Sequence, residues 1–122
     1  MKETEIALEP IAIIGIGCRF PGGVNSPESY WKMLSEGIDA ISEIPSDRWG
    51  VESYYDQDRF KKGKTVSKWG GFLEKFDQFD VEFFGMSPRE AVSLDPQQRL
   101  LLMASWEALE DGGQVLERLA KQ

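Results

Sequence analysis

The helix predicted to begin at Pro96 constrains the fold of this chain more than any other feature. It follows an N-cap aspartate, Asp95, has proline at its first position, and should run to about Asp111, where Gly112 and Gly113 end it. Its first half, "LLLMA", is apolar on nearly all sides, and such a helix is normally buried by several neighbours. A chain of 122 residues has little material to surround it. We therefore expect the chain to be part of a larger α/β protein.

A second apolar stretch, "PIAIIG" at residues 10–15, is rich in β-branched residues. The pattern predicts a strand that is covered on both faces, as in a layered α/β domain. The next stretch, "GIGCRFPGGVNS", contains four glycines and a proline and is predicted to be a loop. We expect its glycines to let the chain turn with unusual dihedral angles.

Start signals for two further helices lie on either side of a poorly periodic region. Ser26 can cap a helix that has Pro27 at its first position and stops near Gly37. The "SPRE" stretch at residues 87–90 is a capping box. Residues 77–84 are expected to form one or two helical turns.

The region between Asp39 and Lys75 mixes aromatic, charged and turn residues without a sustained period. We expect a long loop on the surface, with a short extended piece near "TVSKWGGFL". A loop of this length is usually functional or packs against something outside itself.

Composition excludes several classes of function. The net charge is −7, and the basic cluster at residues 59–64 is short and surrounded by acids, so a nucleic-acid partner is not expected. The chain has one cysteine and no histidine, which leaves no disulfide within the chain and no cysteine-based zinc site. No apolar run reaches the roughly 20 residues of a membrane span. We expect a cytoplasmic protein with Cys18 reduced.

The glycine-rich loop is a poor match to known nucleotide sites. Gly15 and Gly17 fit the start of a dinucleotide fingerprint, but Phe20 stands where its third glycine belongs. The "GKT" stretch at residues 63–65 lacks the preceding glycine of a phosphate-binding loop. Arg19 could favour a thiolate at Cys18. A catalytic cysteine normally has a histidine as its base, and this chain contains no histidine. We therefore expect Cys18 to be an inert thiol in a tight turn.

Carboxylates and aromatic side chains give no stronger candidate. Two acidic groups could gather, one at Asp77 and Asp80 and the other at Glu107, Glu110 and Asp111, but we expect solvated surface acids. The stretches "RWGVESYY" and "FDQFDVEFF" are expected to anchor a core rather than to stack bases. From the residues alone we predict no catalytic, cofactor-binding or metal-binding residue.

Three long stretches carry a family resemblance. They are "EPIAIIGIGCRFPGG", "SPESYWKMLSEGIDAISEIPSDRW" and "KWGGFLEKFDQFDVEFFGMSPREAVSLDPQQRLLLMASWEALEDGG". In this order and spacing they resemble the start of the ketosynthase (β-ketoacyl synthase) domain of modular type I polyketide synthases. The resemblance runs from about Glu9 to the C-terminus, and "DPQQRLLL" with "WEALED" is highly specific. The chain is also similar to ketosynthases of hybrid polyketide–peptide systems.

The resemblance implies the N-terminal portion of a thiolase-like α/β/α/β/α sandwich, incomplete in this chain, in an enzyme that works as a homodimer. It implies an acyltransferase that loads an acyl chain from an acyl carrier protein onto a cysteine. The enzyme then decarboxylates a malonyl-type extender on another carrier and joins the two carbons. Two histidines stabilise the developing charge. No cofactor is expected to bind directly, because the phosphopantetheine belongs to the carrier.

The family's catalytic motifs do not occur in this sequence. The nucleophile belongs to a "TACSSS"-type motif and the histidines to "EAHGTGT"- and "NIGH"-type motifs, whereas Cys18 lies in the family's "GCRFPG" turn. We expect residues 1–9 to form an N-terminal lead, and residues 10–122 to form a β-ketoacyl synthase portion truncated before the catalytic cysteine and inactive alone. By itself it should be oligomeric or molten. The alternatives are a non-catalytic or split-enzyme interaction module that completes a second polypeptide, and an unrelated small binding protein.

Overall fold

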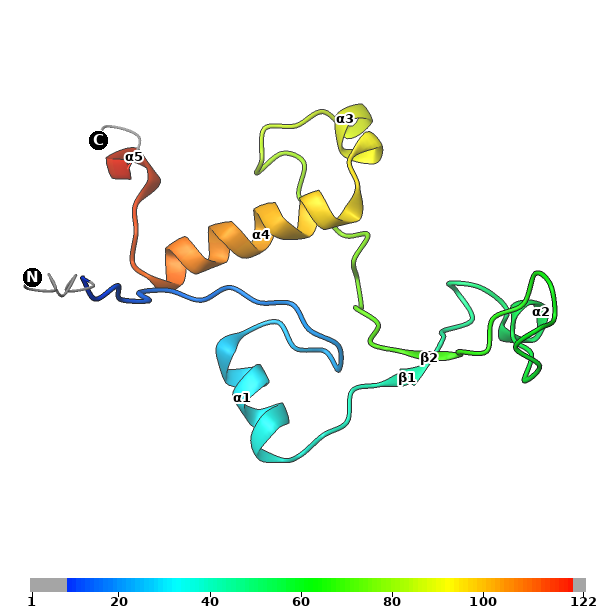
Figure 1. The fold of residues 1–122 in the computed structure, drawn as a ribbon. Coiled ribbons are helices and arrows are strands. Elements are labelled where there is room, and N and C mark those ends of the chain that lie inside the picture. Colours follow the sequence, from blue (N-terminus) through cyan, green and yellow to red (C-terminus); the bar gives the residue numbers. More distant parts are fainter. Residues whose placement is uncertain (1–8, 120–122) are drawn as a thin grey trace, which may run out of the picture.

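The computed structural model describes residues 9–119, which form short helices and a two-stranded sheet joined by long connections (Figure 1). In chain order the elements are α1 (Pro27–Ser35), β1 (Ser42–Glu43), α2 (Val51–Tyr54), β2 (Trp69–Gly70), α3 (Pro88–Ser93), α4 (Pro96–Asp111) and α5 (Leu116–Leu119). Of the predicted lead at residues 1–9, only Glu9 lies within the described residues. Within that range, no helix has the length and apolar character needed to cross a membrane.

The three longer helices begin where their capping residues predict. Ser26 and Ser87 each cap a helix through a complete capping box, and both helices have proline in the first turn. The Oδ1 atom of Asp95 accepts a hydrogen bond from the N–H of Gln97 at 2.8 Å, which caps α4. Each cap satisfies N–H groups that have no partner inside the helix. These predictions of helix starts are confirmed.

The end of α1 shows why Gly37 is needed. The N–H of Gly37 donates to Leu34 O at 3.2 Å and that of Ile38 to Met33 O at 3.1 Å, which is the Schellman arrangement. Gly37 itself has a φ of 64°, a backbone conformation that residues with a Cβ atom rarely adopt. The predicted stop near Gly37 is therefore confirmed.

The long region between α1 and α3 is more ordered than the sequence indicated. It contains the helical turn α2 and the antiparallel pair β1–β2, in which Ser42 faces Gly70 and Glu43 faces Trp69. The predicted extended piece is thus β2. Residues 77–84 contain a single turn, closed by a hydrogen bond of 3.3 Å from Phe84 N–H to Asp80 O.

Residues 10–15 do not form the predicted buried strand. They run as an extended trace beside α4 (Figure 1), and no strand pairs with them among residues 9–119. Ile11 and Ile13 are 94% and 85% exposed. A strand is held by a ladder of hydrogen bonds to its neighbour, and an apolar β-branched run indicates only a preference for such a place. The prediction is wrong for this structure because the described residues supply no neighbouring strand.

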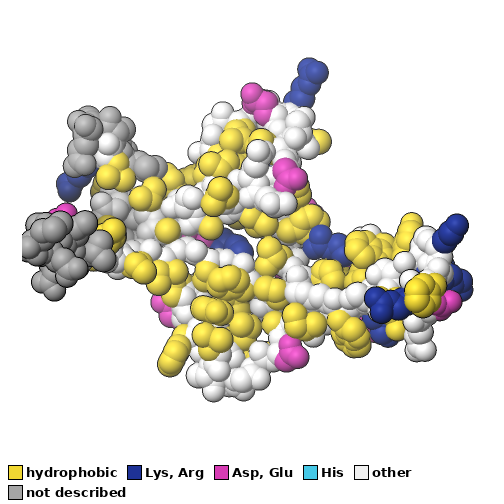
Figure 2. Space-filling view, in the orientation of Figure 1, with side chains coloured by type: hydrophobic (Ala, Val, Ile, Leu, Met, Phe, Trp, Pro, Cys, Tyr) yellow, Lys and Arg dark blue, Asp and Glu magenta, His cyan; other side chains and the backbone are white. Residues whose placement is uncertain are grey.

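The predicted burial of α4 is also absent. None of its 16 residues is buried, and Leu101 is 68% exposed. In the described part of the chain the buried hydrophobic side chains are those of Cys18, Val24 and Ala91. Figure 2 accordingly shows apolar side chains spread over the visible face. The chain forms an α/β framework whose apolar surfaces are left uncovered.

Candidate functional site

The glycine-rich segment after residue 14 lies directly against the backbone of α4. A Cβ atom at Gly15 would come 2.1 Å from Ala108 O, and one at Gly17 would come 2.1 Å from Ala104 O. Neither position therefore has room for any side chain. The two alanines are one helical turn apart and present the same face to the segment. These contacts place the segment on α4 and explain the glycine spacing.

The predicted reason for the glycines is right at two positions and wrong at two others. Gly22 and Gly23 have φ values of 82° and 74° in the turn that follows. Gly15 and Gly17 are not among the residues with positive φ. At these two positions the close approach of a neighbouring backbone, rather than an unusual dihedral angle, excludes a side chain.

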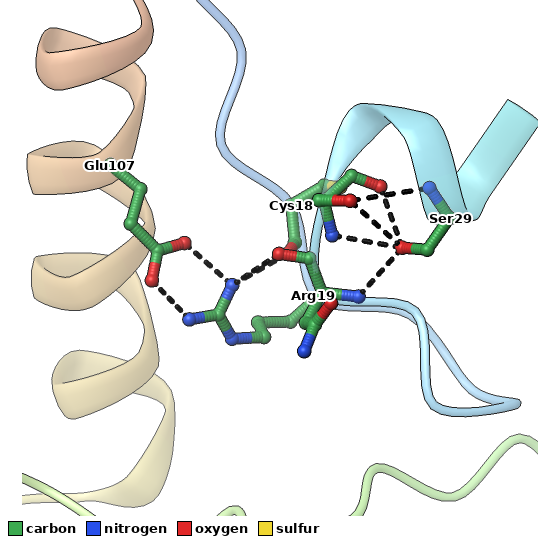
Figure 3. Close-up of polar contacts among 6 residues, drawn as sticks. Cys18, Arg19, Ser29 and Glu107 are labelled. Atoms are coloured by element: carbon green, nitrogen blue, oxygen red, sulfur yellow. Dashed lines mark hydrogen bonds and ion pairs between the residues drawn. The ribbon is translucent and has the colours of Figure 1, made fainter.

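Arg19 joins the same segment to α4 (Figure 3). Its Nη1 atom donates a hydrogen bond to Glu107 Oε2 at 2.5 Å, and its Nη2 atom donates to Glu107 Oε1. Nη1 also donates to the carbonyl oxygens of Cys18 at 2.9 Å and Asn25 at 3.2 Å. The hydrogen bonds to the carboxylate raise the pKa of Arg19 above its usual value, so the guanidinium stays charged. The two-pronged geometry matches the planar fork of arginine.

Two local features fix the position of Arg19. The N–H of Phe20 donates to Val24 O at 3.0 Å, which closes the turn around the two positive-φ glycines. Directly after this turn, Asn25 N–H donates to Ser29 Oγ at 3.2 Å, at the capped start of α1. Figure 3 shows the arginine between this cap and α4. The arginine therefore links the capped start of α1 to a helix 88 residues away in the sequence.

The backbone of the segment also binds to the end of α4. The N–H of Ile16 donates to Asp111 Oδ2 at 2.9 Å. In a dinucleotide site, the amides of such a loop would instead face a phosphate at a helix N-terminus. Here an amide faces a carboxylate, and the next helix begins only at Pro27. This geometry argues against a phosphate site at Gly15 and Gly17.

Cys18 lies in this segment, and its side chain is buried. Burial raises the pKa of the Cys18 thiol, and Glu107 and Glu28 raise it further, while Arg19 opposes them. The net shift is upward, so the thiol stays protonated at neutral pH. Because the thiolate is the reactive form, this environment favours an inert cysteine.

Most of the other predicted candidates have structural partners within the chain. Lys64 of the "GKT" stretch donates through Nζ to Ser53 O at 2.6 Å. Asp80 accepts a hydrogen bond from Phe83 N–H at 3.0 Å. Glu107 and Asp111 are engaged with Arg19 and Ile16 as described above. Across residues 9–119, no group of three or more histidine, cysteine or acidic side chains could hold a metal ion.

The aromatic stretches behave differently from each other. Phe79 stacks on Phe84 with ring centroids 4.9 Å apart, and Phe83 meets Trp106 of α4 edge to face at 4.7 Å. This cluster joins the residues before α3 to α4, but none of its side chains is buried and Phe83 is 53% exposed, so it is a surface cluster rather than the predicted core anchor. Trp49 and Tyr54 of the other stretch are exposed. For these two residues the predicted role as core anchors is wrong, because their side chains are 46% and 54% exposed.

A cavity of about 220 Å³ lies beside Arg19. Its walls include Asn25, Lys75, Gln78, Leu100 and Met103. The guanidinium on its edge already donates to a carboxylate and two carbonyl groups. The geometry therefore supports a structural junction here rather than a reaction centre.

Sequence reasoning missed this junction. It considered Arg19 only as a neighbour of the cysteine, and Glu107 only as a surface acid. Residues 88 positions apart carry no local pattern that would pair them. The glycine spacing was the available signal, since a Gly-x-Gly followed by no helix indicates close backbone contact.

Comparison with known proteins identifies the setting of this junction. Residues 8–122 match the family described as "Beta-ketoacyl synthase, N-terminal domain". The chain is 53% identical over 105 residues to a phenolphthiocerol/phthiocerol polyketide synthase of Mycobacterium tuberculosis, with 86% of this chain covered. It is 52% identical over 117 residues to the phthioceranic/hydroxyphthioceranic acid synthase of the same species, with 96% covered. The chain spans 6% of the length of each relative.

Solved structures of ketosynthase domains also match this chain. The oxazolomycin ketosynthase domain of Streptomyces albus matches with a TM-score of 0.76 and 41% identity over 81% of this chain and 17% of that one. The module 6 ketosynthase of the bacillaene synthase from Bacillus subtilis matches with a TM-score of 0.73 and 37% identity, covering 81% of this chain and 16% of its own.

The predicted family and fold class are confirmed by these matches. The α/β framework is the N-terminal portion of a thiolase-like ketosynthase fold, in which residues 14–19 lie against α4. The chain belongs to the β-ketoacyl synthase family, as the N-terminal part of a ketosynthase domain of the modular polyketide synthase type.

Proposed function

We propose that this chain is part of a ketosynthase that extends an acyl chain by decarboxylative Claisen condensation. The observation that carries the proposal is the match to the N-terminal domain of β-ketoacyl synthases over residues 8–122. The similarity to solved ketosynthases at 41% and 37% identity supports it.

In the proposed reaction, a cysteine thiolate of the enzyme attacks the thioester of an acyl carrier protein, and the carrier thiol leaves. A malonyl-type thioester on a second carrier then loses carbon dioxide. The resulting enolate attacks the acyl carbonyl, forms the new carbon–carbon bond and releases the enzyme thiol. Oxyanion charge develops twice in this sequence, and oriented donors stabilise it. The phosphopantetheine arm enters as part of the carrier-bound substrate.

Within this enzyme we assign residues 10–122 a scaffolding role. Gly15, Gly17 and the Arg19–Glu107 pair hold the first extended segment on α4. The raised pKa of the buried Cys18 thiol supports a nucleophile located elsewhere in the enzyme. We propose that no residue of this chain is catalytic, binds a cofactor or binds a metal, and that the chain alone is inactive.

The proposed partners follow from the same role. They are the rest of the ketosynthase domain, the acyl carrier protein and a second copy of the parent enzyme. The exposed side chains of Ile11 and Ile13 in the first extended segment, and of Leu101 on α4, support the first of these, because large exposed apolar groups mark surfaces that another part covers. A split-enzyme module that completes a second polypeptide would need the same surface. We place the enzyme in the cytoplasm, where disulfides are rare, and a sequence with a single cysteine is in keeping with that.

The test is acyl loading in the synthase polypeptide that contains this chain. We expect Cys18→Ser to form the acyl-enzyme from an acyl thioester at the rate of the unsubstituted protein. Mass spectrometry of the digested protein should place the acyl group outside residues 1–122. Acylation of Cys18, or loss of loading in Cys18→Ser with an unchanged melting temperature, would contradict the proposal.

A further inference from the structure

Arg99, in the first turn of α4, carries a charge that nothing in the described part of the chain balances. The residue is half-buried, and its Nε atom is buried without a hydrogen-bond partner among residues 9–119. Arg99 also forms no ion pair within that range. An arginine side chain keeps its charge in proteins, and a buried donor without an acceptor is destabilising. This feature therefore requires an explanation.

Arg99 lies on a different face of α4 from the junction with residues 14–19. Trp106 follows it by about two helical turns and so shares its face. Trp106 meets Phe83 edge to face, with ring centroids 4.7 Å apart. Ala104 and Ala108, whose carbonyl oxygens face the glycines of the junction, lie on the opposite side of the helix. The unpaired guanidinium is therefore not part of the junction.

The acidic side chains nearest to Arg99 on its own helix are bound elsewhere. Asp95, about one turn earlier, caps α4 by accepting a hydrogen bond from Gln97 N–H at 2.8 Å. Glu107, about two turns later, binds Arg19. Neither carboxylate forms an ion pair with Arg99. The helix itself does not supply the missing acceptor.

Arg48 provides a useful comparison, because its Nε atom is also buried without a hydrogen-bond partner in the described residues. Its Nη2 atom donates to Leu73 O at 2.9 Å. Its guanidinium carbon lies 3.5 Å from the centroid of the Phe76 ring, which is a cation–π contact. The charge of Arg48 thus has partners within the chain, whereas that of Arg99 has none among residues 9–119.

We propose that Arg99 binds a carboxylate of the synthase that lies outside residues 1–122, and that this ion pair fixes α4 to the rest of the ketosynthase domain. The proposal rests on the proposed function. The chain spans 17% of a solved ketosynthase chain, so most of such a domain lies outside it. A buried guanidinium needs a close opposite charge and hydrogen bonds to offset its lost hydration. A carboxylate beside Nε can accept from Nε and one Nη together.

The first experiment is a structure of the intact synthase polypeptide by electron cryo-microscopy, at a resolution that shows side chains. We expect an aspartate or glutamate oxygen from outside residues 1–122 at about 3 Å from Arg99 Nε. A backbone carbonyl, an ordered water or an acidic side chain of this chain in that place would overturn the proposal. This measurement needs no variant, so it stands even if a substitution at Arg99 prevents folding.

The second experiment measures the heat stability of acyl loading in the same polypeptide. Arg99→Gln removes the charge and leaves the partner carboxylate unpaired. We expect the temperature of half-inactivation to fall by about 5 °C. The control is Gln98→Ala, at the exposed neighbouring position of α4, which should shift that temperature by less than about 1 °C. An equal fall in the control would contradict a specific ion pair.

The pair itself is tested by changing the partner carboxylate seen in the map to its amide. Once one member is lost, removal of the other should add little, so the double variant should match the more affected single variant. Additive losses would overturn the pairing. Failure of the proposed function would appear differently, as absence of acyl loading by the unsubstituted synthase. The map would still show which group binds Arg99 in that case.

Discussion

The contact between residues 14–19 and α4 differs in kind from the capped starts of α1 and α3. In the first, Gly17, Arg19 and Ile16 meet residues about 90 positions away. In the second, Ser26 and Ser87 bind groups three residues further along the chain. The caps need only local sequence to form, whereas the contact forms only after a long loop has closed. Changes in the contact should therefore cost more than changes in the caps.

The largest expected effect is that of Gly17→Ala. The new Cβ would lie 2.1 Å from Ala104 O, which is backbone in the middle of α4 and cannot move aside. We expect the ketosynthase domain to lose about 3 kcal/mol of stability, measured by chemical unfolding of the purified domain. Gly50→Ala is the control, since its nearest neighbour is Ser53 Oγ at 3.6 Å. Equal stability of the two variants would show that residues 14–19 do not lie on α4.

The Arg19–Glu107 pair should contribute less, because both side chains keep some contact with water. Glu107→Gln is expected to cost about 1.5 kcal/mol, since a charge-assisted hydrogen bond is weakened in a partly exposed site. Glu110→Gln, nearly one turn further along α4, is the control and should be near neutral. A double-mutant cycle with Arg19→Met measures the coupling directly. Additive losses would mean that the two side chains do not interact.

Loss of a cap should have a smaller and more local effect. Ser26→Ala removes the oxygen that accepts from Ser29 N–H at 3.2 Å, and we expect a cost of about 1 kcal/mol. Ser35→Ala, at the other end of α1, should cost less than about 0.5 kcal/mol. Hydrogen exchange of the first-turn amides of α1 would locate the change. Faster exchange throughout α4 as well would contradict a local effect.

The smallest expected effect is a pH dependence at α3. Hydrogen bonds from the Ser87 backbone and hydroxyl hold the pKa of Glu90 below its usual value. Because the folded-state pKa is the lower one, the stabilisation is present above the unfolded-state pKa and is lost as pH falls through the folded one. An NMR titration should show the pKa of Glu90 rising in Ser87→Ala. The backbone N–H of residue 87 remains in this variant, so an unchanged pKa would exclude the Ser87 hydroxyl as a cause.

Local features of this chain were predictable because their causes are local. The starts of α1, α3 and α4 follow from Ser26, Ser87 and Asp95 with the prolines behind them. The end of α4 follows from two glycines. In each case the residues that decide the outcome lie within one helical turn of it. The family could also be predicted from the sequence, because long motifs carry the resemblance.

The candidate site was much less predictable. The sequence placed Arg19 beside a cysteine and Glu107 among surface acids, and nothing local pairs them. Trp49 and Tyr54 are large aromatic residues of the kind expected in a core, but the structure leaves them exposed. Burial and ion pairing depend on which other elements pack against a residue. The residues next to it in the sequence do not indicate which elements those are.

By itself, the sequence determined where helices begin and end, since capping and helix-stopping act over three or four residues. It also determined the family. Only the tertiary structure decided that the backbone of α4 packs against Gly15 and Gly17, where a side chain would not fit, and that Arg19 pairs with Glu107. It also decided that residues 10–15 remain an unpaired extended segment among the described residues. The physical reason is that strand pairing, close approach and ion pairing are properties of two segments together, whereas a cap is a property of one.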